Sequence, residues 1–378
     1  MPCAECKGKG MCGLPRCPIV SRFHAQVAAK PASWYQGSSP SVFIGSFGYP
    51  DVRGGPLLIN DTDNPPDWIR DNLGIEDIVG IRARTIRGNS SILRLAGGLQ
   101  EIALSSVPVD VDVTFEKPVE FSLHFDGTVS PVGFLGALKK MDLVGSAKVG
   151  RAVDRITSDT DIVATDAAIA LNSDGVDVYQ IAQLMTAGLL GKRRKFVPTR
   201  WAITAVDDTL STGLKKKIAR FAPLEEIQVF SGEIYGNRIV TILLPGDWKY
   251  EMIEVWGKHT LWAGDDEVIV QDREGMTKHG YSPISGAYYS ARLAVCEYLM
   301  SIRRSARVVV VRSISSDYWA PLGTWVIREA VRKAMSVTPV SCASLDMAVV
   351  QAVSLIGSGT WVPHSTLIPE MRTQRTLF

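Results

Sequence analysis

Apolar residues in the C-terminal third of the chain recur with the period of helices, interrupted by one continuous apolar run. They return every three or four positions in 285–305, 322–335 and 345–357, which predicts three helices. The run over 306–314 is mostly valine and other apolar residues, which predicts a buried strand. This part of the chain is therefore expected to pack helices against a central strand.

The middle of the chain shows the shorter period of strands. Apolar and polar residues alternate over 106–125, which predicts two strands joined by a turn at Lys117–Pro118. A hairpin is predicted over 226–245, with its turn at 235–237. Further patterns predict a helix over 176–191 and strands over 249–257 and 266–275.

Residues 31–66 are rich in proline, glycine, serine and asparagine and predict irregular structure around a short strand near Val42–Ile44. Aromatic side chains distinguish this segment from a flexible linker, so we expect it to pack on the body of the protein. These aromatic residues are Trp34, Tyr35, Phe43, Phe47 and Tyr49. Because strands and helices mix along the chain without regular alternation, an α+β fold is favoured over a doubly wound sheet.

The expected organisation is one large mixed α+β domain over 21–370, with a possible internal division near 190–225. A small four-cysteine segment over 1–20 precedes this domain, and a short flexible tail over 371–378 follows it. A chain of 378 residues, 46% of them hydrophobic, can bury a sizeable core without help from disulfides or metals.

The charge balance argues against a broad basic field that would coat nucleic acid. Lysine and arginine number 41 against 39 aspartate and glutamate, which leaves a formal net charge of +2. A local basic groove is compatible with that balance. The first residues lack the pattern of a secretory leader, and the apolar stretches are short or interrupted. We expect a soluble, cytoplasmic protein without a membrane partner.

Four of the six cysteines lie close together at the N-terminus, and they are Cys3, Cys6, Cys12 and Cys17. Two close thiol pairs around a short turn suit a tetrahedral thiolate site, in which zinc would replace the core that so short a segment cannot build. Because four protein ligands close such a site, we expect a structural role. An iron–sulfur cluster is the alternative.

A compact basic run precedes an arginine and a tryptophan, and together they could form a phosphate-contacting patch with an aromatic platform for DNA or a nucleotide. These residues are Lys192, Arg193, Arg194, Arg200 and Trp201. Tyr289 and Arg292 form a second combination, in which the ring could stack on a base and the guanidinium could clamp a phosphate. The alternatives are a solvated helix end for the first group and a helix–sheet interface with buried ion pairs for the second.

Two stretches are candidates for catalysis. His124 and Asp126 lie on one face of a predicted strand, where they could form a general base, a metal site or only a local hydrogen bond. A strand-like run over 201–206 ends in Asp207 and Asp208, which could bind a divalent metal or orient a ribose, although a helix N-cap is favoured. No nucleophile signature accompanies these residues, so the sequence leaves enzymatic activity open.

The sequence finishes on QRTLF. An exposed Leu377–Phe378 pair would lower solubility, so either the tail folds back onto the body or it binds in the pocket of another protein. Gln374, followed by Leu377 and Phe378, resembles the PIP box through which proteins bind the sliding clamp, with one aromatic residue fewer than usual. The resemblance implies that these three residues contact the clamp.

Longer blocks resemble the archaeal Nre family of DNA repair proteins over nearly the whole chain. These blocks are the four-cysteine N-terminus, FSLHFDGTVSPVGFLGALKKM, VPTRWAITAVDDTLS, YWAPLGTWVIREAV and QRTLF. The resemblance implies a protein with an N-terminal zinc ribbon, a form of zinc finger, that acts in DNA repair and engages the sliding clamp PCNA through its C-terminus. It implies metal binding by the four cysteines and clamp binding by the tail.

The favoured hypothesis is therefore a DNA repair factor with a zinc ribbon, a body that binds DNA or a nucleotide, and a clamp-binding tail. The alternative is an enzyme acting on a nucleotide or a damaged base. Its pocket would form around His124, Asp126, Arg200, Asp207 and Asp208, and it requires these side chains to converge in space.

Overall fold

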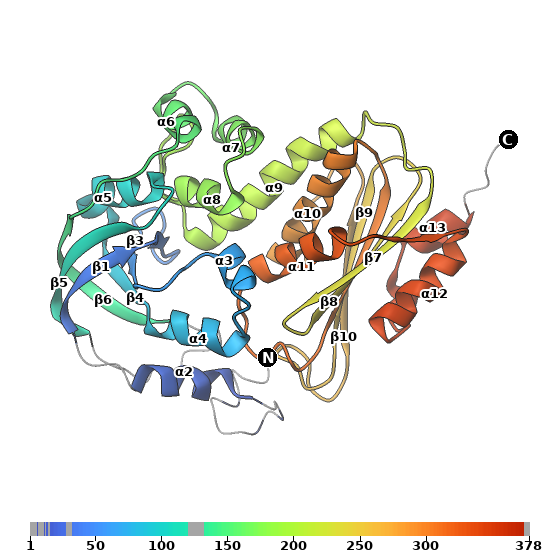
Figure 1. Cartoon of the computed structure of the whole chain (residues 1–378), viewed down its shortest axis with the longest axis horizontal. Helices are drawn as coiled ribbons and strands as arrows, with labels where there is room; N and C mark the ends of the chain where they lie inside the picture. Colours follow the sequence, from blue (N-terminus) through green and yellow to red (C-terminus); the bar gives the residue numbers. More distant parts are fainter. Residues whose placement is uncertain are drawn as a thin grey trace. The chain divides into compact units, whose positions relative to one another are not determined.

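The computed structural model describes residues 6, 11, 13, 16–27, 32–119 and 132–373 (Figure 1). These residues form two compact units, each with its own six-stranded sheet. The N-terminal unit comprises the described residues between Pro18 and Leu210. The C-terminal unit comprises those from Ser211 onward and those before Pro18. Each unit combines helices with a largely antiparallel sheet, so the fold class is α+β.

The sheet of the N-terminal unit has the strand order β1-β5-β6-β4-β3-β2, and only β4 and β6 are parallel neighbours. Helix α5 packs on β2, β3, β4 and β6, and α8 packs on α5 and β2. The strands are β1 (Ala32–Ser39), β2 (Ser41–Ile44), β3 (Arg53–Leu58), β4 (Ile86–Ser91), β5 (Val109–Val119) and β6 (Phe134–Leu143). The helices are α2 (Pro18–Val27), α3 (Pro65–Arg70), α4 (Ile75–Arg84), α5 (Ile92–Leu104), α6 (Arg151–Ser158), α7 (Ala164–Ser173) and α8 (Val178–Thr186).

Strand β5 shows the predicted alternation, because Val109, Val111 and Val113 are buried while the residues between them are exposed. The predicted turn at Lys117–Pro118 is wrong, since the strand continues through both residues to Val119. A register shift in the pairing with β1 falls in this stretch. An irregular ladder tolerates proline, which has no N–H group to donate.

The sheet of the C-terminal unit has the order β10-β9-β11-β8-β7-β12, in which only β9 and β11 are parallel neighbours. Helices α10 and α11 lie on one side of this sheet, and α12 and α13 lie on the other (Figure 1). The strands are β7 (Ile227–Ile234), β8 (Asn237–Leu244), β9 (Lys249–Trp256), β10 (Val268–Glu274), β11 (Arg307–Ile314) and β12 (Val340–Cys342). The helices are α9 (Thr199–Ile218), which crosses the boundary between the units, α10 (Gly286–Ile302), α11 (Trp325–Met335), α12 (Leu345–Ile356), the short 3-10 helix η1 (Val362–His364) and α13 (Leu367–Thr373).

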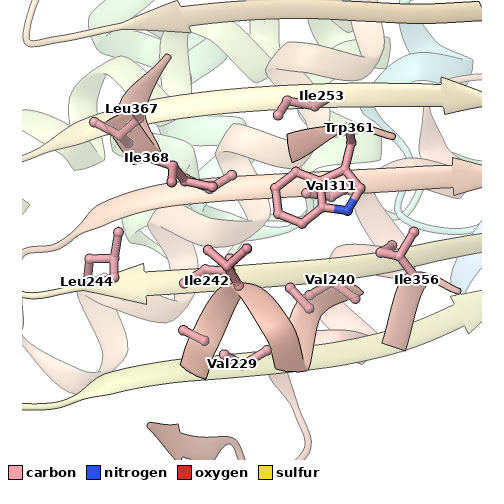
Figure 2. Close-up of a cluster of buried hydrophobic side chains, with 14 of the residues drawn as sticks. Val229, Val240, Ile242, Leu244, Ile253, Val311, Ile356, Trp361, Leu367 and Ile368 are labelled. Carbon is pink, nitrogen blue, oxygen red and sulfur yellow. The ribbon is translucent and has the colours of Figure 1, made fainter. Parts of the chain in front are cut away.

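The buried strand predicted over 306–314 is confirmed as β11, at the centre of this sheet. Together with β8 and β9 it supplies one wall of an apolar core that α12 and α13 cover (Figure 2). Ile242, Ile253 and Val311 come from three adjacent strands, and Trp361 is fully buried against them. This packing fixes α13 on the sheet, because Leu367 belongs to the same core.

The hairpin predicted over 226–245 is β7–β8. Its two-residue turn, Tyr235–Gly236, has positive φ at both residues (51° and 70°), as a type I′ turn requires. The helices predicted over 285–305, 322–335 and 345–357 are confirmed as α10, α11 and α12. None of the helices in the described ranges is both long and apolar enough to cross a membrane.

The predicted strand over 201–206 is wrong, because these residues belong to α9. Ala202, Val206 and Leu210 are buried at intervals of four residues, which is the spacing of one helix face. The β-branched and aromatic residues between these positions suggested a strand. The helical spacing of the buried side chains outweighs that local preference.

Residues 31–66 contain three strands, of which the sequence predicted one, at β2. The expectation that this segment packs on the body is confirmed, because its three strands belong to the sheet of the N-terminal unit, although three of its five aromatic side chains are exposed. The exposed fractions are 62% for Trp34, 97% for Phe47 and 44% for Tyr49. Two of these exposed rings, Phe47 and Tyr49, lie in the connection between β2 and β3, where they form an exposed aromatic surface.

Candidate nucleic-acid interface

Strand β2 forms one edge of its sheet, and its outward-facing N–H groups are satisfied by side chains. The N–H of Val42 donates to Oε1 of Gln183 at 3.0 Å, and the N–H of Ile44 donates to Oγ1 of Thr199 at 2.9 Å. Pro56 lies opposite Val42 in β3, where no ladder hydrogen bond is needed. The edge is thus closed against further strand pairing, and the end of β2 is held at the first residue of α9.

The connection between β2 and β3, residues 45–52, is an ordered loop that carries exposed rings; we call it the aromatic loop. At its base, the N–H of Gly45 donates to the carbonyl of Arg53 at 2.9 Å. At its tip, the N–H of Asp51 donates to the carbonyl of Gly48 at 2.9 Å, and Gly48 has a φ of 79° that favours glycine. These bonds set the direction of Phe47, whose side chain is 97% exposed.

Trp201, in the first turn of α9, extends the exposed aromatic surface of this loop. The ring centroids of Tyr49 and Trp201 are 5.2 Å apart with an angle of 60° between the ring planes, an edge-to-face contact. Trp201 is 49% exposed despite this contact. We call Phe47, Tyr49 and Trp201 the aromatic face of the N-terminal unit.

Basic side chains adjoin the aromatic face in the sequence. Arg200, next to Trp201, is exposed, and among the described residues its guanidinium makes no ion pair. Arg53, at the base of the loop, is exposed and donates from Nε to Oδ1 of Asn89 at 3.2 Å. Asp51 contributes one exposed carboxylate to the same loop. The local charge therefore favours an anionic ligand by a small margin.

The predicted basic run separates into two groups. Lys192 and Arg193 are exposed in the turn before α9. Arg194 instead stabilises that turn, because its Nε donates to the carbonyl of Gly191 at 3.2 Å and its Nη2 to the carbonyl of Asp159 at 2.9 Å. Lys192 and Arg193 are therefore available for phosphate contacts, whereas the hydrogen-bond donors of Arg194 are engaged by the backbone.

Tyr289 and Arg292 lie in the C-terminal unit and are buried rather than exposed. Arg292 donates from Nε to Oγ of Ser211 at 3.0 Å and pairs with Glu274, which also binds Nζ of Lys215 at 2.7 Å. The guanidinium carbon of Arg292 lies 5.2 Å from the centroid of the Tyr289 ring. This arrangement matches the alternative of a helix–sheet interface with buried ion pairs, and neither side chain is presented at the surface.

A pocket of about 410 Å³ adjoins these buried charges in the C-terminal unit. Its basic side chains face carboxylates, since Lys278 lies 2.8 Å from Asp272, and Lys249 pairs with Glu370. Burial raises the pKa of the nearby Cys296 thiol far above its ordinary value, so that this thiol stays protonated. The pocket thus has neither a surplus of positive charge nor a reactive thiol.

A pocket of about 620 Å³ in the N-terminal unit is acidic. Its carboxylates outnumber its cations, and Arg84 pairs with Asp61 at 3.3 Å. The acidic lining residues are Asp61, Asp71, Glu76 and Asp77. This surface repels phosphate, so the aromatic face suits nucleic acid better than either pocket does.

The candidate catalytic residues do not assemble into a site within the described part of the chain. Asp207 is buried and Asp208 half-buried in the interior of α9, so neither caps a helix N-terminus as the sequence had favoured. Arg200 lies seven residues earlier on that helix, about 10 Å along its axis. His124 and Asp126 lie outside the described residues.

Two of the four predicted metal ligands lie within the described residues. Cys6 is buried, and its Sγ accepts a hydrogen bond from the N–H of Met11 at 3.1 Å; Cys17 is half-buried. An N–H group that donates to sulfur is compatible with the predicted role of Cys6 as a metal ligand, which stays a prediction. Cys3 and Cys12 lie outside the described residues, as do Gln374, Leu377 and Phe378 of the predicted clamp-binding tail.

Phe47, Tyr49, Gln183 and Thr199 were not singled out from the sequence as site residues. The exposure of Phe47 and Tyr49 could have been predicted, because the segment SFGYP places both aromatic residues next to turn-forming glycine and proline, and a turn exposes its side chains. Nothing in the sequence marks Gln183 and Thr199, which act through contacts with residues more than 140 positions away.

Replacing Thr199 with valine tests whether its hydrogen bond with the Ile44 N–H stabilises the end of β2 that leads into the aromatic loop. The substitution keeps the shape of the side chain but removes the acceptor for the Ile44 N–H, and we expect it to lower the free energy of unfolding by about 1–2 kcal/mol. Thr204→Val is the control, because in the described part of the chain the Thr204 hydroxyl donates within α9 alone, to the carbonyl of Arg200. Urea unfolding of both variants measures the difference, and equal losses would contradict the role given to Thr199.

Comparisons with known proteins cover the whole chain. Residues 11–263 match the family model described as Archaeal Nre, N-terminal, and residues 273–378 match Archaeal Nre, C-terminal. The DNA repair protein NreB of Archaeoglobus fulgidus is 36% identical over 392 residues, covering 100% of this chain and 99% of that protein. The DNA repair protein NreA of the same organism is 34% identical over 376 residues, covering 95% of each.

The DNA repair protein NreA of Haloferax volcanii is 34% identical over 327 residues, covering 80% of this chain and 78% of that protein. No solved structure matches the chain significantly. Because both family models and full-length relatives match, the chain belongs to the archaeal Nre family.

Proposed function

We propose that this chain is a DNA repair protein that binds DNA through the aromatic face of its N-terminal unit and engages the sliding clamp PCNA through its C-terminal tail. The observation that carries the DNA-binding part is the exposure of three aromatic rings on one loop–helix junction, next in sequence to Arg200, whose guanidinium makes no ion pair within the described residues. Rings and cations in this combination bind bases and phosphates. The names of the curated relatives support a role in DNA repair.

The modest net charge of +2 sets the expected strength of this binding. A few cations contact phosphates, and we assign this role to Arg200, Lys192 and Arg193 because all three are exposed. Few phosphate contacts give weak affinity and a shallow dependence on salt. The clamp would compensate by holding the protein on DNA, since two linked contacts raise the effective concentration of each.

Arg200→Gln tests the DNA contact. Removing one phosphate contact should weaken binding of a fluorescent oligonucleotide and lower the slope of log K against log salt by about one. Arg155→Gln is the control, because Arg155 is exposed but already paired with Asp174. If the unaltered protein does not bind DNA even at about 50 mM salt, where phosphate contacts are strongest, the DNA-binding part of the proposal fails.

The clamp-binding part rests on the tail and on the helix before it. The buried Leu367 and Ile368 hold α13 on the C-terminal unit, and Nη2 of Arg372 lies 2.7 Å from Oδ1 of Asp346 in α12. The helix that precedes the peptide from Gln374 to Phe378 in the sequence is therefore held on this unit. We assign the glutamine to a polar pocket of the clamp, and Leu377 and Phe378 to its apolar pocket.

Deleting residues 374–378 should abolish binding to an archaeal PCNA in a calorimetric titration, and Phe378→Ala should weaken it at least tenfold. Thr376→Ala, a substitution within the same peptide, should leave the affinity unchanged, because this residue is not assigned to a pocket. Equal affinity of the full-length and truncated proteins would show that the clamp contact lies elsewhere or does not exist.

For the metal, we infer that Cys3, Cys6, Cys12 and Cys17 hold a structural zinc ion. The spacing of the thiols supports this, as does the hydrogen bond that Cys6 accepts from Met11. Zinc would replace a hydrophobic core in this segment and would take no part in chemistry at the aromatic face.

Replacing Cys3 and Cys6 together with serine should release about one metal ion per chain, measured by elemental analysis of the purified protein. Cys342→Ser is the control, since Cys342 lies in β12 of the C-terminal unit. Metal content that stays the same in the double variant would exclude the site.

A further inference from the structure

We propose that the aromatic face is specific for single-stranded DNA and that Phe47 stacks on an unpaired base. This inference rests on the proposed function and names the form of DNA that the site takes. Its starting point is the near-complete exposure of the Phe47 side chain. Exposed phenyl groups are unfavourable in water, and a ring that is 97% exposed gains almost no stabilisation from burial in return.

The loop presents the ring in a defined position. Hydrogen bonds close both its base and its tip, and Gly48, directly after Phe47, adopts the left-handed conformation that reverses the chain there. The loop joins β2, whose end is tied to Thr199 at the start of α9. A ring held in this way loses little conformational entropy on binding, so its stacking energy is retained.

The contact between Tyr49 and Trp201 provides further stacking surface. Because the two rings meet edge to face, they cannot cover each other, and roughly half of each residue stays accessible (44% and 49%). With Phe47, they offer successive platforms for the bases of a flexible strand. Such platforms tolerate any sequence, because every base has a π face.

Duplex DNA does not suit this surface. In a duplex the faces of the bases are covered by their neighbours, and only base edges and phosphates are accessible. Binding would then depend on phosphate contacts alone. The carboxylate of Asp51, within the loop, opposes a closely approaching backbone, so Arg53 and Arg200 leave only a small surplus of positive charge for the phosphates of a duplex. The bases of a single strand can stack on the aromatic face, whereas the bases of a duplex cannot.

The test measures the affinity of the full-length protein for a fluorescent oligonucleotide of mixed sequence, alone and annealed to its complement, in the same low-salt buffer. The single strand should bind at least tenfold more tightly. Phe47→Ala should weaken single-strand binding by about 5- to 140-fold, the range of one lost stacking contact, and leave duplex binding unchanged.

Two matched variants separate stacking from hydrophobic contact. Phe47→Tyr keeps the π face and should retain the affinity, whereas Phe47→Leu keeps an apolar side chain without a π face and should lose it. Because the Phe47 side chain is 97% exposed, none of these substitutions should alter the urea midpoint, which is the check on folding.

The two proposals fail in different ways. If neither form of DNA binds the unaltered protein, the proposed DNA binding itself is wrong. If both forms bind equally and Phe47→Ala changes nothing, DNA binding stands and the stacking inference is overturned, which would leave Phe47 as a contact for another protein. Loss of duplex binding in Phe47→Ala would also overturn specificity for single strands.

Discussion

The candidate interface depends on how the edge strand β2 satisfies its outward N–H groups. An unpaired N–H at the edge of a sheet either binds water, recruits another strand or needs a partner from its own chain. Here the partners are Gln183 and Thr199, at 3.0 and 2.9 Å. Since Thr199 begins α9, the bond that closes the edge also brings the aromatic loop to the turn that carries Trp201. The hydrogen bonds that satisfy the edge strand thus also position the aromatic face.

A buried carboxylate has a comparable role in the C-terminal unit. Glu251 of β9 is fully buried and accepts hydrogen bonds from the N–H and the hydroxyl of Thr366, both at 2.7 Å, and from Gln271 at 2.8 Å. These hydrogen bonds offset the free-energy cost of removing the carboxylate from water. They also fix the first turn of α13, the helix that precedes the tail in the sequence. The elements that precede the proposed DNA and clamp contacts are therefore each held by hydrogen bonds to polar side chains.

Much of the fold follows from the sequence, because hydrophobic periodicity reports burial directly. The valine run of β11 and the helical spacing of α10 to α12 were predicted for this reason. The run over 201–206 was mistaken for a strand, since local β propensity obscured the buried positions Ala202 and Val206. At the site, Arg200 and Trp201 were named from local composition. The contact between Tyr49 and Trp201 could not be predicted from local composition, because it joins residues 152 positions apart.

The central claim is that DNA lies on the aromatic face, and photocrosslinking tests it most directly. A single-stranded oligonucleotide carrying bromodeoxyuridine would be irradiated with the full-length protein, and the modified peptides identified by mass spectrometry. The account predicts crosslinks at Phe47, Tyr49 or Trp201. Crosslinks confined to the C-terminal unit, at DNA concentrations that saturate the protein, would contradict it.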